Sequence, residues 1–196
     1  SLKDAPALIE RLLPVQKLSA EAYKEQMAGS GKTLTPLGSY WKGRKPLILN
    51  KACILGCLLP ATDNQARDLE IFEMLMGMDM ASLEGRLEAK NDKESRFILG
   101  QHRSVGHNAP YRVWVQSASR AEECGAGLFD HIWDAVNAHL GTGAQSFPEL
   151  VEQLGIMRFG HRPRVADTFC GSGQIPFEAA RLGCDVYASD LSPIAC

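Results

Sequence analysis

Glycines and acids suited to holding a small ligand are concentrated in one stretch near the end of the sequence, residues 165–190. The stretch reads VADTFCGSGQIPFEAARLGCDVYASD. Two apolar runs, each followed by an acid, flank a helical pattern. We therefore expect a strand ending at Asp167, a glycine turn at 171–173, a helix, and a second strand closed by Asp190. In such a unit a nucleotide-like ligand lies over the turn, and an acid about 20 residues further on binds its ribose.

Two features of this turn favour S-adenosylmethionine over a dinucleotide. A dinucleotide site has a third glycine for close helix packing, and Pro176 occupies that position here. The carboxylate of Asp167 would repel a pyrophosphate, whereas it suits the ammonium and sulfonium groups of S-adenosylmethionine. We predict that Asp167 faces the methionine end of this cofactor and that Asp190 binds its ribose hydroxyls.

The segment Asp-Thr-Phe-Cys-Gly-Ser-Gly at 167–173 resembles the Asp-Pro-Phe-x-Gly-Ser-Gly cofactor motif of amino-methyltransferases that act on nucleic acid, with Thr168 in place of the proline. The resemblance implies an α/β, Rossmann-like, S-adenosylmethionine-dependent methyltransferase fold. Only its first βαβ unit would lie in this sequence, after a mainly helical N-terminal domain. The residues implied to bind the cofactor are Asp167, Phe169, Cys170, Gly171, Ser172, Gly173, Asp190 and Leu191.

A second informative stretch, residues 33–60, places aromatic and basic residues in a loop before a strongly apolar helix at 47–59. With parts of residues 5–21, it resembles the N-terminal domain of large bacterial adenine-specific DNA methylases, which are similar to enzymes of anti-phage gene clusters. Their Trp-x-x-(Arg/Lys)-(Arg/Lys)-Pro segment corresponds to residues 41–46. The resemblance implies that this loop helps to close the methionine end of the cofactor. From its place before the apolar helix, we predict that Lys45 or Tyr40 reaches the cofactor carboxylate or closes over the adenosyl group. We also expect the apolar helix to be buried on all sides against the sheet of the cofactor domain.

We divide the chain into a helical N-terminal domain with the closing loop (1–60), a mainly helical insertion or continuation (61–155), and the start of the methyltransferase domain (156–196). In the first segment the patterns predict helices at about 5–13 and 20–28. In the second they predict helices at 64–78, 82–90, 120–140 and 147–154, a polar loop at 91–110 and a short strand at 111–116.

One tetrapeptide comes close to a catalytic motif. Amino-methyltransferases hold the target amine with (Asp/Asn/Ser)-Pro-Pro-aromatic, whose ring stacks on a flipped base. The sequence Asn-Ala-Pro-Tyr makes Asn108, Pro110 and Tyr111 the candidates here, with Ala109 replacing the first proline. An ordinary polar loop is the alternative, and the resembled family carries its motif after the cofactor unit. We therefore expect the chain to be the N-terminal part of a larger enzyme and to be inactive alone.

Composition and charge narrow the classes of protein. Hydrophobic residues make up 45% of the 196 residues, enough for a buried core, and the net charge is −2. Residues 1–60 carry nine Lys and Arg against four Asp and Glu, which suits proximity to nucleic acid. No apolar run reaches the ~18 residues of a membrane span.

The six cysteines are scattered, so we expect reduced thiols in a cytoplasmic protein. Cys53 and Cys57 have no second pair at a metal-site spacing, and we expect no metal.

Three functions remain open from the sequence. The first is a DNA adenine N6-methyltransferase with a role in host DNA modification or phage defence, with DNA and defence-system proteins as partners of the larger protein. The second is an RNA guanine N2-methyltransferase, because the turn followed by Glu-Ala-Ala at 178–180 resembles that class equally well. The third is a non-catalytic nucleic-acid-binding or assembly module that keeps a degenerate cofactor pocket.

Overall fold

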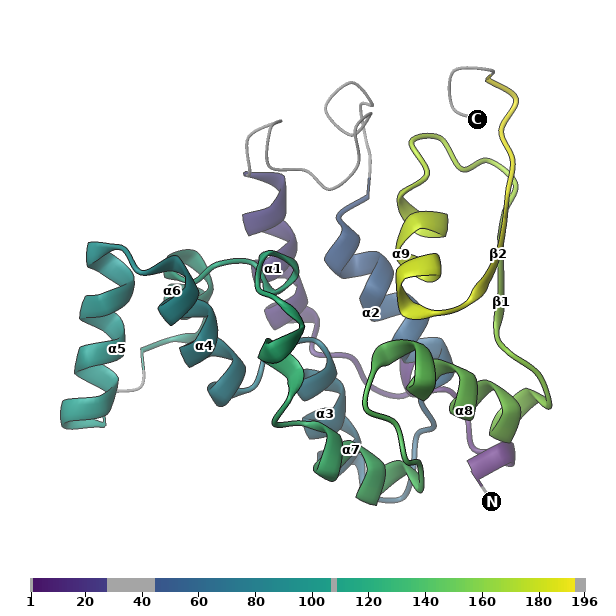
Figure 1. Cartoon of the computed structure of the whole chain (residues 1–196), viewed down its shortest axis with the longest axis horizontal. Coiled ribbons are helices and arrows are strands. Elements are labelled where there is room, and N and C mark those ends of the chain that lie inside the picture. The colour runs from purple at the N-terminus through teal and green to yellow at the C-terminus, as the bar shows by residue number, and fades with distance from the viewer. Residues whose placement is uncertain (1, 28–44, 107–108, 193–196) are drawn as a thin grey trace.

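A computed structural model describes residues 2–27, 45–106 and 109–192 of the chain (Figure 1). Helices dominate, and the two strands come last in the chain. The helices are α1 (Val15–Gln26), α2 (Leu47–Leu58), α3 (Gln65–Leu75), α4 (Met80–Lys90), α5 (Lys93–Val105), α6 (Tyr111–Ser117), α7 (Trp133–Leu140), α8 (Phe147–Phe159) and α9 (Gln174–Leu182); the strands are β1 (Arg164–Asp167) and β2 (Asp185–Ala188).

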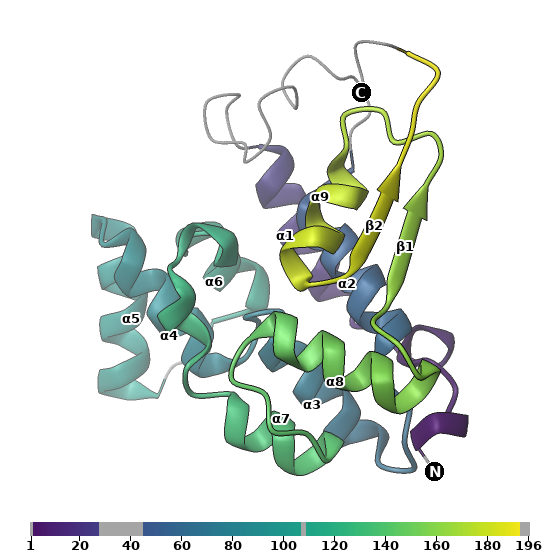
Figure 2. The same ribbon diagram turned by 45° about the vertical axis from the view of Figure 1, so that its right-hand side comes forward.

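The last segment forms a parallel strand-helix-strand unit, as the apolar runs and glycines predict. β1 and β2 lie side by side, with Arg164 opposite Asp185 and Asp167 opposite Ala188 (Figure 2). Helix α9 begins after Gly173 and ends at Gly183, and both glycines have positive φ. At Gly183 a Cβ would come within 2.6 Å of the Pro148 backbone at the start of α8. Glycine is therefore required there both for the turn and for the close approach of α8 and α9.

Helix α2 forms over residues close to those predicted, but its surroundings differ from the prediction. It packs on helix α9 and helix α1, with smaller contacts to α8 and to the short turn at Leu8–Glu10. Leu55 is fully buried in the main core, while Cys53 and Cys57 on the same helix are exposed. Packing against the cofactor unit is observed, through α9, but the expected burial on all sides against the sheet is wrong, because the helices α9 and α1 are its main neighbours and Cys53 and Cys57 stay exposed.

The main core draws on residues from Leu8 to Cys184. Its members come from all three sequence segments, including Leu55 of α2, Val136 of α7 and Leu182 of α9. A second, smaller cluster joins α4, α5 and α6 around Trp114. None of the helices in the described ranges is long and apolar enough to cross a membrane.

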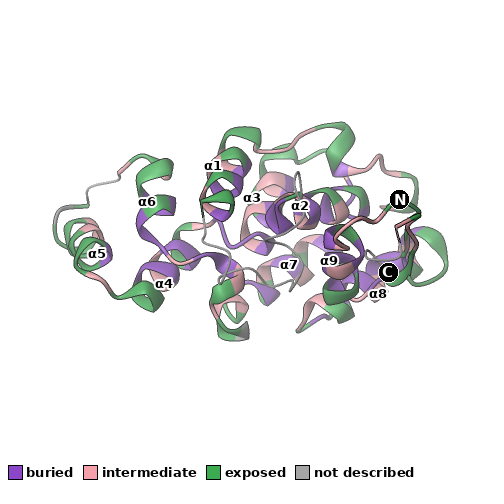
Figure 3. Ribbon diagram, turned by 90° about the horizontal axis from the view of Figure 1, so that it is seen from above, coloured by how far each residue is buried: buried purple, intermediate pink, exposed green. Residues whose placement is uncertain are grey.

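Two predictions for residues 91–117 are wrong. The expected polar loop contains α5, which Asp92 caps by accepting a hydrogen bond from the Ser95 amide at 2.8 Å. This helix lies at one end of the molecule with much of its surface exposed, which explains its polar composition (Figure 3). The expected strand is helix α6. Its neighbouring residues Trp114 and Val115 are both buried, whereas a half-buried strand would bury only alternate residues.

The remaining differences concern helix boundaries. The helix predicted at 5–13 is replaced by short 3₁₀ turns, among them Leu8–Glu10. The next helix, α1, begins directly after Pro14, earlier than predicted. The single helix predicted at 120–140 is two short turns followed by α7. Gly125 and Gly127 lie in the interrupted part, and glycine in a helix interior costs about 1 kcal/mol relative to alanine.

Candidate functional site

The acids predicted at the two strand ends lie at one edge of the parallel pair. Asp167 is the last residue of β1, and Asp190 follows β2 by two residues. Asp190 Oδ2 accepts a hydrogen bond from the Gly171 amide, and its Oδ1 accepts one from the Ser192 amide, both at 2.8 Å. The second strand end is thereby joined to the glycine turn that follows the first.

The turn between β1 and α9 is organised by its backbone. Gly171 and Gly173 have φ values of 53° and 72°, a region that favours glycine. The Cys170 amide donates to the Ser189 carbonyl at 3.0 Å, which holds the turn against the end of β2. The Phe169 amide donates to Asp167 Oδ1 at 3.2 Å. Asp167 Oδ2 accepts no hydrogen bond from the residues that the structure describes, so it is available to a ligand.

The charge of Asp190 is set by the same contacts. The amides of Ser192 and Gly171 lower the pKa of this carboxyl below its usual range, because both hydrogen bonds favour the ionised form. Each carboxylate oxygen has a second lone pair. Asp190 is therefore an ionised hydrogen-bond acceptor at this edge of the sheet.

Exposed apolar side chains border the turn on both sides. Phe169 is 73% exposed and Leu191 is 87% exposed. Phe169 follows the end of β1 by two residues and Leu191 follows the end of β2 by three, so apolar surface, carboxylates and a close backbone approach meet at one edge. This combination suits a ligand with a planar base, a ribose and a positive group.

The other predicted site residues are placed differently. Tyr40 and Asn108 lie outside the described residues. Lys45 is exposed, two positions before α2 begins. Pro110 immediately precedes α6.

Tyr111 takes part in a buried contact. Its hydroxyl donates to Glu21 Oε1 at 2.7 Å, and burial raises the pKa of the phenol. Glu21 also pairs with the fully buried Arg86. The structure thus ties Tyr111 to the packing of α1 and α4, and brings together at the turn Asp167, residues 169–173, Asp190 and Leu191.

Sequence reasoning missed a second group of polar residues, on helices α2 and α9. Lys51 lies in the middle of the apolar helix α2, and Glu178 lies on the buried side of α9. Both line a cavity of about 380 Å³. A lysine, next to Asn50, inside a strongly apolar helix was the available signal. Its partners could not be read from the sequence, because Phe129 and Phe147 lie far along the chain.

Metal ligation finds no support in the part of the chain that the structure describes. No group of three His, Cys, Asp or Glu side chains is arranged there to hold a metal ion. The cysteines of α2 are free thiols.

Comparison with known families gives one match, over residues 12–75. The matching family is described as a protein of unknown function (DUF1156). The matched part runs from before α1 to the end of α3 and includes α2. A search of curated proteins finds no match, and neither does a search of solved structures.

Proposed function

We propose that this chain is the N-terminal part of an S-adenosylmethionine-dependent DNA methyltransferase that modifies the N6 amine of adenine, with a role in host DNA modification or phage defence. The observation that carries the proposal is the hydrogen bond from the Gly171 amide to Asp190. It draws the acid after β2 and the glycine turn after β1 into one site at the carboxyl edge of the sheet. Ligands of parallel α/β sheets bind at this edge.

Each residue of the turn has a role in this proposal. Asp190 accepts hydrogen bonds from the ribose hydroxyls, and the free oxygen of Asp167 faces the methionine ammonium. Phe169 and Leu191 flank the adenine ring. S-adenosylmethionine supplies an electrophilic methyl group. Lys45 and Tyr40 belong to the proposed closing loop, which rests on the resemblance of residues 41–46 alone.

The exposed sheet supports a place within a larger domain. Tyr187 of β2 is 62% exposed and Val186 is 36% exposed. Parallel strands are covered on both faces in α/β proteins. A Rossmann-like methyltransferase domain would cover this sheet with the further strands and helices of the larger protein.

Methylation by the full-length protein tests the proposal. The protein is incubated with S-adenosylmethionine labelled in its methyl group, and with either duplex DNA or transfer RNA. We expect N6-methyladenine in the DNA. Label in N2-methylguanine of the RNA would support the RNA enzyme instead, and cofactor binding without transfer to either would support the non-catalytic module.

The 196-residue chain alone is expected to transfer no methyl group, because its sequence contains no (Asp/Asn/Ser)-Pro-Pro-aromatic tetrapeptide. Turnover by this chain would contradict that expectation. It would make Asn108, Pro110 and Tyr111 the candidate residues for holding the target amine.

A further inference from the structure

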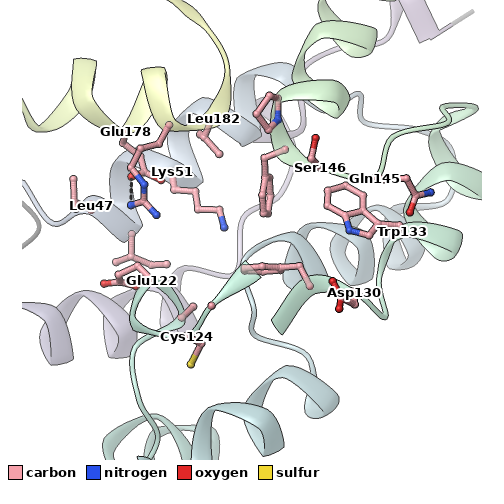
Figure 4. Close-up of a pocket in the computed structure, with 17 residues that line it drawn as sticks. Leu47, Lys51, Glu122, Cys124, Asp130, Trp133, Gln145, Ser146, Glu178 and Leu182 are labelled. Atoms are coloured by element: carbon pink, nitrogen blue, oxygen red, sulfur yellow. Dashed lines mark hydrogen bonds and ion pairs between the residues drawn. The ribbon is translucent and has the colours of Figure 1, made fainter. Parts of the chain in front are cut away.

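A cavity away from the glycine turn lies where the three sequence segments meet. Its walls come from α2, the start of α8, the second half of α9 and residues 121–133 (Figure 4). Its volume of about 380 Å³ falls in the range of small-molecule sites. Aromatic rings of Phe129, Trp133 and Phe147 form one side, with Phe129 and Phe147 packed edge to face at 5.0 Å.

Lys51 extends from α2 into this cavity (Figure 4). Its Nζ lies 4.2 Å from the ring centre of Phe147 and 4.7 Å from that of Phe129. Among the described residues, no oxygen accepts a hydrogen bond from this amine and no carboxylate pairs with it. Burial lowers the pKa of Lys51 to about 8, so the amine is mostly charged at pH 7. The lysine is therefore a cation packed against two ring faces, and the charges of Glu178 and Glu122 in the same walls partly offset the effect of its burial.

The acids in the same walls already have arginine partners. Glu178 pairs with Arg181 at 3.0 Å, and Glu122 pairs with Arg120 at 3.5 Å. Burial raises the pKa of Glu178 to about 7 and also raises that of Glu122. Among the described residues of these walls, Lys51 is thus a cation whose amine takes part in no hydrogen bond or ion pair and can meet a ligand.

We propose that this cavity binds a small organic monocarboxylate with a flat apolar body. The carboxylate receives hydrogen bonds from Lys51, and the apolar body lies against the aromatic side of the cavity. A charge-assisted hydrogen bond in a partly dry site is among the stronger polar contacts a ligand can make.

The cavity walls select among anions. A phosphate is best held by several N–H donors, whereas among the described wall residues Arg181 is paired with Glu178 and Lys51 offers a single amine beside the rings. A second carboxylate on the ligand would meet Glu122 and the exposed Asp130 at the wall. A ligand with one carboxylate on an aromatic or branched aliphatic body needs only one amine donor and brings no second charge near Glu122 and Asp130.

Calorimetric titration of the chain with phenylacetate tests this proposal, and phenylacetamide of nearly the same shape is the control ligand. We expect phenylacetate to bind at least tenfold more tightly. Lys51→Met keeps the apolar stem and removes the charge, and it should abolish this preference. Lys93→Met, at an exposed lysine of helix α5, should leave it unchanged. Equal binding of the two ligands, or an unchanged preference in Lys51→Met, would overturn the proposal.

The pH dependence of the unsubstituted chain keeps the proposal testable if Lys51→Met fails to fold. Phenylacetate affinity should fall as pH rises through about 8, where Lys51 loses its proton. The titratable groups that share the cavity are Glu178 and Arg181 of α9, with Glu122, Cys124 and Asp130 opposite. Since Glu178 titrates near 7, the measurement is repeated in Glu178→Gln. If the fall in phenylacetate affinity persists in this variant, it supports Lys51 as the residue that binds the carboxylate. Loss of the pH dependence refutes the proposal.

Discussion

Asp190 and Gly171, 19 residues apart in sequence, are joined by a hydrogen bond of 2.8 Å from the Gly171 amide to the Asp190 carboxylate. One side chain thereby sets the position of the glycine turn and presents an ionised acceptor beside it. The contact gives Asp190 two roles, one in shaping the turn and one in binding the proposed ribose.

Two replacements of Asp190 test these roles. Asp190→Ala removes both, and we expect the full-length protein to bind S-adenosylmethionine roughly 10–100-fold more weakly, the scale of lost hydrogen bonds to a charged acceptor. Asp190→Asn keeps one oxygen acceptor and should lose less. Calorimetry measures the affinities. Asp185→Ala, at the opposite end of β2, is the control, and an unaltered affinity in Asp190→Ala would contradict the assigned role.

Position 173 requires glycine because of its backbone conformation, since no neighbouring atom would clash with a larger side chain. Its φ is 72°, and a Cβ there would meet no atom within 4 Å. We expect Gly173→Ala to lower the free energy of unfolding by about 1–2 kcal/mol, the strain of an L-residue in the left-handed region. Gly100→Ala is the matched control, because it also meets no atom within 4 Å but lies inside helix α5.

In helix α5 the same change should act in the opposite direction. Gly100→Ala should raise the free energy of unfolding by about 0.8–1 kcal/mol through helix propensity. Urea unfolding of the two variants gives both values. A neutral Gly173→Ala would show that the turn relaxes without strain.

A buried ion pair joins helices α1 and α4. Arg86 is fully buried and donates to both oxygens of Glu21, at 2.7 and 2.8 Å. It also donates to the carbonyls of Gly77 and Ser119. We expect Glu21→Ala to lower the free energy of unfolding by about 3–5 kcal/mol, because Arg86 is left as an uncompensated buried charge.

A second variant separates the pair from the phenol that supports it. Tyr111→Phe removes one hydrogen bond to Glu21 and leaves the pair intact, so it should lower the free energy of unfolding by only about 1 kcal/mol. Chemical unfolding of both variants gives the comparison. A loss in Tyr111→Phe as large as that in Glu21→Ala would place the main stabilisation on the phenol.

Local signals were sufficient for the parallel strand-helix-strand unit and for α2. Gly173 and Gly183 mark both ends of α9 in the sequence, and Pro46 stands directly before α2. These elements begin and end where single residues restrict the backbone. Both acids of the candidate site follow from the same local pattern, because each lies at or just after a strand end.

Contacts between segments far apart in the sequence determine the features that local patterns did not predict. Helix α6 has a strand-like composition, and it is helical because Trp114 and Val115 both enter the small core formed with α4 and α5. The cavity around Lys51 was hidden for the same reason. Its aromatic wall, Phe129 and Phe147, comes from segments about 80–100 positions away, and no local pattern connects them with α2.

The charge of Lys51 should make stability depend on pH in a defined window. Folding lowers the pKa of its amine from 10.5 to about 8, so the folded state binds the proton less well than the unfolded state. The resulting penalty is fully present below pH 8, where both states are protonated. It fades as pH rises from 8 to 10.5, because the folded state then gains by releasing its proton first.

Removal of this charge should therefore stabilise the ligand-free chain. We expect Lys51→Met to raise the free energy of unfolding at pH 7 by on the order of 1–3 kcal/mol, reduced by the lost contact with the two rings. The difference between Lys51→Met and the unsubstituted chain should shrink between pH 8 and 10.5, as followed by urea unfolding at each pH. Lys45→Met, at an exposed position, should show no such trend. A difference that stays constant across this window would mean that Lys51 keeps an ordinary pKa and that its surroundings are wetter than the ring contacts indicate.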